Sequence, residues 1–183
     1  MKIETYTKTI DVDTYIEDYV NVEEFLEYCK VCRNYNRKWC CPAFDFSPVS
    51  DYWRRYDKLK VVGKKMLLDE ADKENWESLM AQVKAELTAE LYEEEVKNPG
   101  SISLSAGSCT ICGEDNCTKK TGEDCRFPEK MRYSIEALGG NVGLTASKLL
   151  GIRLQWMEED KVPDYFVLVG GLLIRPESQP EDA

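Results

Sequence analysis

Five segments of the chain combine apolar residues with the β-branched and aromatic types that favour strands. They are residues 3–10, 58–68, 102–106, 152–156 and 165–174. The first contains three Thr and one Tyr, and the second and last are rich in Val and Leu. These residue types pack well on a pleated surface. The pattern therefore predicts a sheet of four or five strands.

Apolar residues spaced three or four positions apart predict helices elsewhere. The clearest case is residues 72–97, which Asn98-Pro99-Gly100 ends. The apolar face of this expected helix consists of Trp76, Leu79, Met80, Val83, Leu87 and Leu91. Residues 15–28 predict one or two short helices that end at Cys29.

Proline and glycine mark the ends of three further helices. A short helix is expected after Ser47-Pro48, because proline is favoured at the first helical position. A second is expected over residues 128–138, which begin with proline and are followed by two glycines. A third is expected over residues 142–150, and a glycine follows it as well.

Together these elements predict an α+β fold, or a three-layer α/β variant, with helices packed on a mixed sheet of four or five strands. Nothing in the sequence marks a domain boundary, so residues 1–175 are expected to form one domain with its own core. Residues 176–183 are rich in Pro and Glu and are predicted to be a disordered tail.

The charge of the chain argues against some classes of binding partner. The chain has 24 Lys and Arg against 34 Asp and Glu, a formal net charge of −10. This argues against nucleic acid as a partner, because a phosphate backbone favours Lys and Arg. No polybasic segment suggests an anionic membrane either. The acidity favours solubility, and it also suits a basic redox partner protein.

The sequence also predicts a cytoplasmic location. Residues 1–6 contain no apolar signal segment, and the longest apolar stretch, residues 165–174, is too short to span a bilayer. Disulfides are rare in the cytoplasm. Metal binding is therefore preferred to disulfide pairing as the reason for a high cysteine content.

The chain contains eight cysteines and no histidine. Thiolates are ligands for zinc and for iron–sulfur clusters. Without histidine, a metal site must be sulfur-rich or be completed by carboxylate, water or inorganic sulfide. The same absence removes Ser-His-Asp and Cys-His catalysis, and no catalytic residue is identified.

The second cysteine group has the spacing Cys109-x2-Cys112-x4-Cys117-x7-Cys125. Four thiols so close in sequence can surround one metal centre. The expected helix that begins at Pro128 would present its N-terminal N–H groups to an anionic centre. Nearby basic residues could offset the thiolate charge, and they are Lys119, Lys120, Arg126 and Arg132. The alternative is a zinc knuckle that only holds a loop.

The first cysteine group contains Cys29, Cys32, Cys40 and Cys41. Adjacent cysteines point apart and seldom bind the same small centre, so this group is expected to offer three thiolates. Three thiolates can hold an iron–sulfur cluster with one iron open to an external ligand. The alternatives are a second structural site, or a buried apolar cysteine beside a metal site.

Both groups lie in motifs that resemble those of an uncharacterised family, the predicted metal-binding proteins with domain of unknown function 2284. The first motif runs from Cys29 to Pro42, and the second from Cys109 to Gly139. The resemblance extends over about residues 20–175 and implies metal binding. In the family pattern the cysteine two positions after Trp39 precedes two prolines, which selects Cys41 over Cys40 as ligand. This chain departs from the pattern at Ala43 and in having Cys40.

The leading hypothesis is therefore a single cysteine-rich metal-binding domain over residues 1–175. It would carry one or two iron–sulfur clusters, of the 4Fe-4S type, and serve redox or electron transfer in anaerobic metabolism. The expected ligands are Cys29, Cys32, Cys41, Cys109, Cys112, Cys117 and Cys125. The alternatives are a zinc-binding structural or adaptor protein, and an enzyme that uses an open cluster iron as a Lewis acid.

Overall fold

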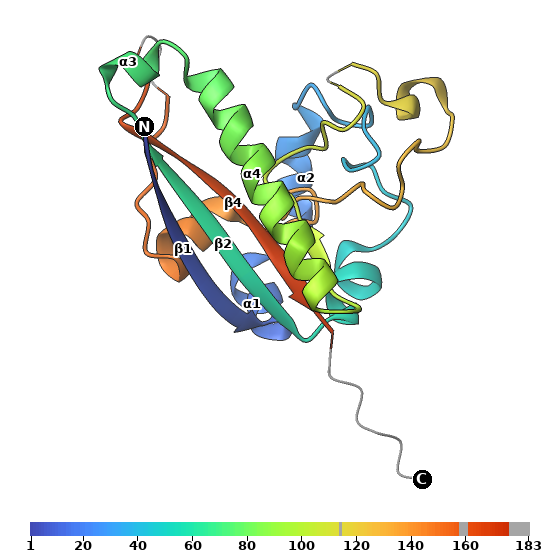
Figure 1. The fold of residues 1–183 in the computed structure, drawn as a ribbon. Coiled ribbons are helices and arrows are strands. Elements are labelled where there is room, and N and C mark those ends of the chain that lie inside the picture. The colour runs from blue at the N-terminus through green and yellow to red at the C-terminus, as the bar shows by residue number, and fades with distance from the viewer. Residues whose placement is uncertain (114, 158–160, 176–183) are drawn as a thin grey trace.

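The computed structural model describes residues 1–113, 115–157 and 161–175. A four-stranded sheet forms its centre, in the order β1-β2-β4-β3 (Figure 1). The strands are β1 (Lys2–Asp11), β2 (Lys58–Leu67), β3 (Ile102–Leu104) and β4 (Tyr165–Ile174). All three strand pairs are antiparallel. The expected α+β fold with a four-stranded sheet is confirmed, but the expected mixed strand pairing is wrong, because all three pairs are antiparallel.

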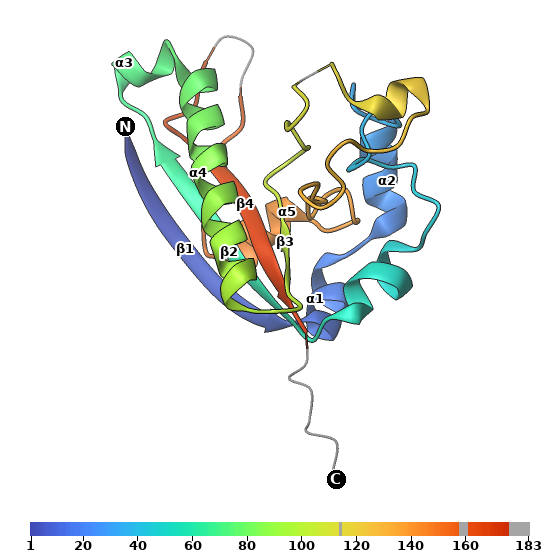
Figure 2. The same cartoon turned by 45° about the vertical axis from the view of Figure 1, so that its right-hand side comes forward.

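Helices and helical turns cover both faces of the sheet (Figures 1 and 2). The α-helices are α1 (Val12–Tyr19), α2 (Val22–Lys30), α3 (Glu70–Lys73), α4 (Trp76–Lys97) and α5 (Val142–Leu144). Shorter π- and 3-10 turns are η1 (Pro48–Tyr52), η2 (Trp53–Arg55), η3 (Thr118–Thr121) and η4 (Thr145–Leu149).

Successive side chains of β2 point to opposite faces of the sheet, and a hydrophobic core lies on each face. Val62 on one face packs with Leu87 and Leu91 of α4. Leu59 and Val61 on the other face belong to the larger core, which also contains residues of α1, η2 and η4. The helix α4 therefore covers one face of the sheet, and the remaining chain, including both cysteine groups, builds on the other face and beside it (Figure 2).

The prediction of a helix over residues 128–138 is wrong. Residues 131–133 have no regular secondary structure, and Ser134 forms a parallel bridge with Ser105, just beyond β3. The backbone N–H of Ser105 donates to the carbonyl of Tyr133 at 2.9 Å. This long-range pairing competes with helical hydrogen bonds, so residues 135–139 form only turns. The expected helix N-terminus at Pro128 is absent.

The predicted strand over residues 152–156 is also wrong, because these residues have no ladder partner in the described part of the sheet. The side chain of Ile152 is buried against the sheet face at Gly63, where an added Cβ would lie 3.3 Å from its Cδ1. The segment therefore packs across a face and does not extend an edge. The predicted tail over 176–183 lies outside the described residues. None of the described helices is long and apolar enough to cross a membrane.

Candidate metal centre

The two cysteine-bearing segments, residues 29–42 and 109–125, lie side by side (Figure 2). The Lys38 ammonium donates to the carbonyl oxygen of Cys109 at 3.1 Å. The Trp39 indole N–H donates to the Thr118 hydroxyl at 3.2 Å. Lys119 donates in the opposite direction, to the carbonyl of Cys41 at 3.2 Å. These hydrogen bonds join the two segments into one unit.

All four thiols of the second cysteine group line one small cavity of about 20 Å³. Cys109, Cys112, Cys117 and Cys125 reach it from the loop before and after η3. Burial raises the pKa of the Cys109 thiol, and neighbouring thiols, among them Cys112, raise it further. Because a metal binds the thiolate and releases the proton, metal binding at this group should weaken as the pH falls.

Cys40 is a fifth thiol at this cavity. Its side chain is buried, and its Sγ accepts a hydrogen bond from the backbone N–H of Cys109 at 3.1 Å. The Cys41 thiol lies 3.7 Å away, sulfur to sulfur. Hydrogen bonding to Cys41 lowers the pKa of Cys40 to about 7, and hydrogen bonding to Cys40 raises that of Cys41. Cys40 thus belongs to the second group in space, although it belongs to the first in sequence.

The remaining thiols of the first cysteine group gather near the end of α2. Cys29 is in the last turn of this helix, and the backbone N–H of Cys32 donates to the Cys29 carbonyl at 3.0 Å. Cys32 is exposed, and Cys29 and Cys41 are half-buried. Burial raises the pKa of Cys29, with further contributions from Cys32 and Glu136. Cys32 also contributes to the raised pKa of Cys41, so Cys32 acts electrostatically on both other thiols.

The thiols are neighbours in two adjacent groups and do not form a finished coordination shell. Within the described ranges, no three Cys, Asp or Glu side chains are already arranged as metal ligands. The donor set itself fits a soft metal or an iron–sulfur cluster, because thiolate sulfur is the dominant ligand type in both groups.

Two lysines that the sequence analysis did not single out lie between the groups. The side chain of Lys38 is buried, and Lys84 reaches the same region from α4, where its ammonium donates to the carbonyl of Ser108 at 2.5 Å. Burial lowers the pKa of Lys84, and the nearby Lys38 lowers it further. The thiols of Cys40 and Cys109 act in the opposite direction. Both lysines therefore place positive charge beside the thiols.

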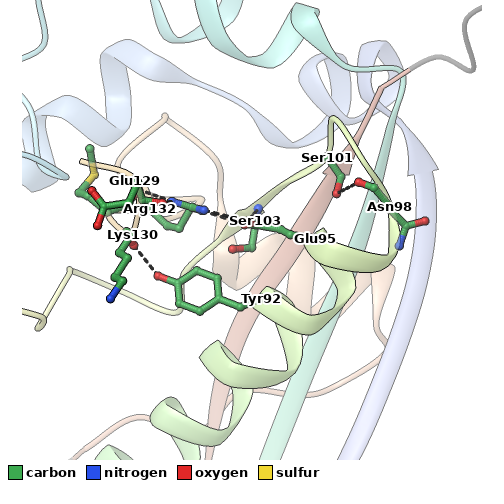
Figure 3. A network of polar contacts seen from close by, with 9 residues as sticks. Tyr92, Glu95, Asn98, Ser101, Ser103, Glu129, Lys130 and Arg132 are labelled. Carbon is green, nitrogen blue, oxygen red and sulfur yellow. Dashed lines mark hydrogen bonds and ion pairs between the residues drawn. The ribbon is translucent and has the colours of Figure 1, made fainter. Parts of the chain in front are cut away.

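Arg132, expected to offset thiolate charge, instead fastens its segment to α4 (Figure 3). Its guanidinium binds the Glu95 carboxylate through two hydrogen bonds, of 2.8 Å to Oε1 and 2.7 Å to Oε2. Glu95 also accepts from the backbone N–H of Ser103. The Tyr92 hydroxyl donates to the Lys130 carbonyl. This network holds the chain just after Cys125 and thereby positions the second cysteine group.

Glu136 is a further residue that the sequence analysis did not single out. Its Oε2 is buried and has no hydrogen-bond partner. Burial raises the pKa of this carboxyl, although hydrogen bonding within the turn and the charge of Lys84 oppose the rise. Glu136 and Cys29 line the same cavity, which has a volume of about 200 Å³. Only the folded chain reveals this pairing, because the two residues are far apart in sequence.

Fold and site together define a thiol-rich α+β protein whose two cysteine groups share one side of a small antiparallel sheet. Residues 14–174 match the family model described as predicted metal-binding protein (DUF2284). The chain belongs to this family, and the expected resemblance is confirmed. No curated protein and no solved structure matches the chain.

Proposed function

We propose that this metal-binding protein holds an iron–sulfur cluster of the 4Fe-4S type and transfers electrons. The observation that supports this most strongly is the presence of seven motif thiols in two adjacent groups of a chain without histidine. A closed structural zinc site needs four ligands. Three further thiols beside such a site suit a cluster with one iron that the thiols leave open.

The two cysteine groups would play different parts. Cys109, Cys112, Cys117 and Cys125 are numerous enough to hold all four irons of one cluster. Cys29, Cys32 and Cys41 would hold three irons of a second. The ammonium groups of Lys38, Lys84 and Lys119 lie close to these segments and would stabilise the negative charge of thiolates and sulfide. The bound cluster would supply one-electron transfer.

The proposal extends to location and partner. A cytoplasmic location would keep the thiols reduced and available for metal. The net charge of −10 favours a partner with a basic surface, since complementary charge speeds the encounter of electron-transfer proteins. We therefore expect a redox partner protein and neither a nucleic acid nor a membrane.

Anaerobic purification followed by iron, acid-labile sulfide and zinc quantification tests the proposal. We expect a brown protein in which sulfide matches iron, because a cubane cluster contains both in equal number. A colourless protein with stoichiometric zinc and no sulfide would overturn the proposal.

That second result would support a zinc-binding structural or adaptor protein, which one observation favours. The space among the thiols of the second cysteine group is about 20 Å³, close to the roughly 10–15 Å³ that one water-sized sphere requires. This space suits a single ion better than a cluster. Zinc bound by four thiolates would then hold the loop of residues 109–125 together.

A further inference from the structure

The carboxyl of Glu136 has a buried oxygen that lacks a hydrogen-bond partner. A buried polar oxygen without a hydrogen bond is costly, and the cost is larger for a charged group. The Oε2 atom of Glu136 has no such partner. Titratable groups that act on Glu136 electrostatically include Lys84, Cys29 and Tyr15. The Lys84 ammonium is bonded to the Ser108 carbonyl, and the Tyr15 hydroxyl to Thr145.

The turn that carries Glu136 is held firmly against α2. The backbone N–H of Asn21, just before this helix, donates to the Gly139 carbonyl at 2.8 Å. Gly139 has a φ of +85°, and an added Cβ would lie 2.7 Å from the Cα of Val22. On the other side, the Trp53 indole N–H donates to the carbonyl of Leu138 at 3.0 Å. The position of Glu136 relative to α2 is therefore set by the backbone.

The cavity beside this turn combines apolar walls with two metal-binding groups. Its walls include Val22, Leu26, Phe44 and Phe46. Cys29 and Glu136 are its two lining residues with thiol or carboxyl side chains, and Pro42, which directly follows Cys41, also lines it. Apolar walls exclude water and strengthen the attraction between a cation and a carboxylate. The cavity thus brings an unpartnered oxygen next to Cys29, one thiol of the cysteine group that lacks a fourth ligand.

We propose that the Glu136 carboxylate is the fourth ligand of the metal centre at Cys29, Cys32 and Cys41. The inference rests on the proposed function only in requiring a metal at the first cysteine group. Carboxylate oxygen binds both iron and zinc, and it satisfies the tetrahedral requirement that three thiolates leave open. Because oxygen is a harder ligand than thiolate, Glu136 is also the ligand that an incoming molecule displaces most readily.

Cobalt titration of the metal-free protein tests this assignment without any assay of activity. Cobalt(II) occupies thiolate sites and gives absorption bands that depend on the number of sulfur ligands. The variants are Glu136→Gln, which keeps the shape of the side chain and removes its charge, and Glu136→Cys, which replaces oxygen by sulfur. Glu129→Gln is the matched control, since Glu129 is exposed and lies in the same segment.

We expect Glu136→Gln to weaken cobalt binding at one site by at least the 10–100-fold that loss of an outer-shell partner costs. Glu136→Cys should keep cobalt bound and intensify the thiolate-to-cobalt band, because a fourth sulfur joins the shell. Glu129→Gln should match the wild type. Wild-type affinity and spectrum in Glu136→Gln would overturn the assignment. If Glu136→Gln does not fold, the Glu136→Cys band decides: a stronger band supports the assignment and an unchanged band overturns it.

The cobalt titration and the metal analysis together separate this inference from the proposed function. Zinc without sulfide in the native protein would end the iron–sulfur proposal, while the cobalt titration could still support Glu136 as a ligand. Conversely, a brown, sulfide-containing protein with wild-type cobalt binding in Glu136→Gln would keep the proposed function and overturn the ligand assignment.

Discussion

At the scale of single residues, the adjacent cysteines Cys40 and Cys41 do not point apart as the sequence analysis expected, because their sulfur atoms lie 3.7 Å from each other. Cys40 lines the cavity of the second cysteine group and accepts from the Cys109 N–H. Cys41 interacts electrostatically with Cys32 of the first group. The resemblance to the family motif selects Cys41 as the expected ligand. It could not place Cys40, because that position depends on how two distant segments fold together.

We predict that Cys40→Ser retains the full metal content and that Cys41→Ser loses part of it. A serine hydroxyl at position 40 can still accept the hydrogen bond from the Cys109 N–H, so the loop keeps its geometry. Metal per chain, measured after anaerobic purification of both variants, checks this. Loss of metal in Cys40→Ser together with retention in Cys41→Ser would show that the two residues exchange these roles.

A second residue-scale prediction concerns Lys84. Its ammonium lies near the thiols of Cys40 and Cys109, and a positive charge stabilises the more negative, reduced state of a cluster. Lys84→Met should therefore lower the reduction potential of the proposed cluster. A change of about 1 kcal/mol, typical of a partly screened charge, corresponds to roughly 40 mV for one electron.

Anaerobic redox titration measures this potential. Lys97→Met is the matched control, because Lys97 is exposed in the last turn of the same helix. The control should keep the wild-type potential. An equal shift in both variants would mean that the effect comes from net charge alone and not from the position of Lys84.

At the scale of elements, the local sequence pattern correctly predicted those helices and strands that local interactions determine. The helical spacing of apolar residues found α4, and the Thr- and Val-rich segments found β1, β2 and β4. The pattern failed over residues 128–138, where Ser134 pairs with Ser105 and Arg132 binds Glu95. These long-range contacts outweigh local helix signals, and no single-segment pattern contains them.

The pair of Glu95 and Arg132 should contribute strongly to stability. Both side chains are mostly buried, with 15% and 14% exposed, so removal of one charge leaves the other uncompensated. We predict that Glu95→Gln lowers the free energy of unfolding by about 3 kcal/mol at neutral pH. Denaturant unfolding measures it, and Glu93→Gln is the control. Glu93 is exposed on the same helix, and its ion pair with Lys97 spans 3.9 Å, so its loss should cost little.

The effect should also depend on pH. Burial acts to raise the pKa of Glu95, but the hydrogen bonds from Arg132 and Ser103 outweigh it and hold that pKa below the ordinary value of 4.5. The stabilisation is therefore present above about pH 4.5 and is lost as the pH falls through the lower folded pKa. The difference between wild type and Glu95→Gln should shrink over that acid range. A difference in unfolding free energy that stays constant down to acid denaturation would contradict a stabilisation that depends on the charge of Glu95.

At the scale of the whole molecule, the feature that matters most for function is that the two cysteine groups lie next to each other. Sequence spacing predicted each group. The contacts that join them, Lys38 to Cys109 and Trp39 to Thr118, arise only from the tertiary fold. The same holds for Glu136, whose approach to Cys29 depends on the turn packed against α2. Motifs identify thiols, whereas carboxylates and lysines that support them are scattered along the chain.

We expect the two groups to differ in their importance for the fold. The second group has four thiols around one small cavity, and its loop contains little regular structure to hold it otherwise. Cys32, in contrast, is exposed beside the end of a helix. Cys112→Ser should therefore reduce metal retention and thermal stability more than Cys32→Ser does. Cys32→Ser should mainly alter redox behaviour, because an incomplete shell at the surface is suited to exchange of ligands.

The helix once expected at Pro128 plays no part in this asymmetry, which rests on the number and burial of the thiols. Metal content and thermal unfolding of both variants, measured without oxygen, test it. Cys41→Ser provides a second probe of the first group, since Cys41 is less exposed than Cys32. If it resembles Cys32→Ser, the distinction lies between groups and not between degrees of exposure. Equal losses in Cys112→Ser and Cys32→Ser would point instead to one centre shared by both segments, which their hydrogen-bonded contact would permit.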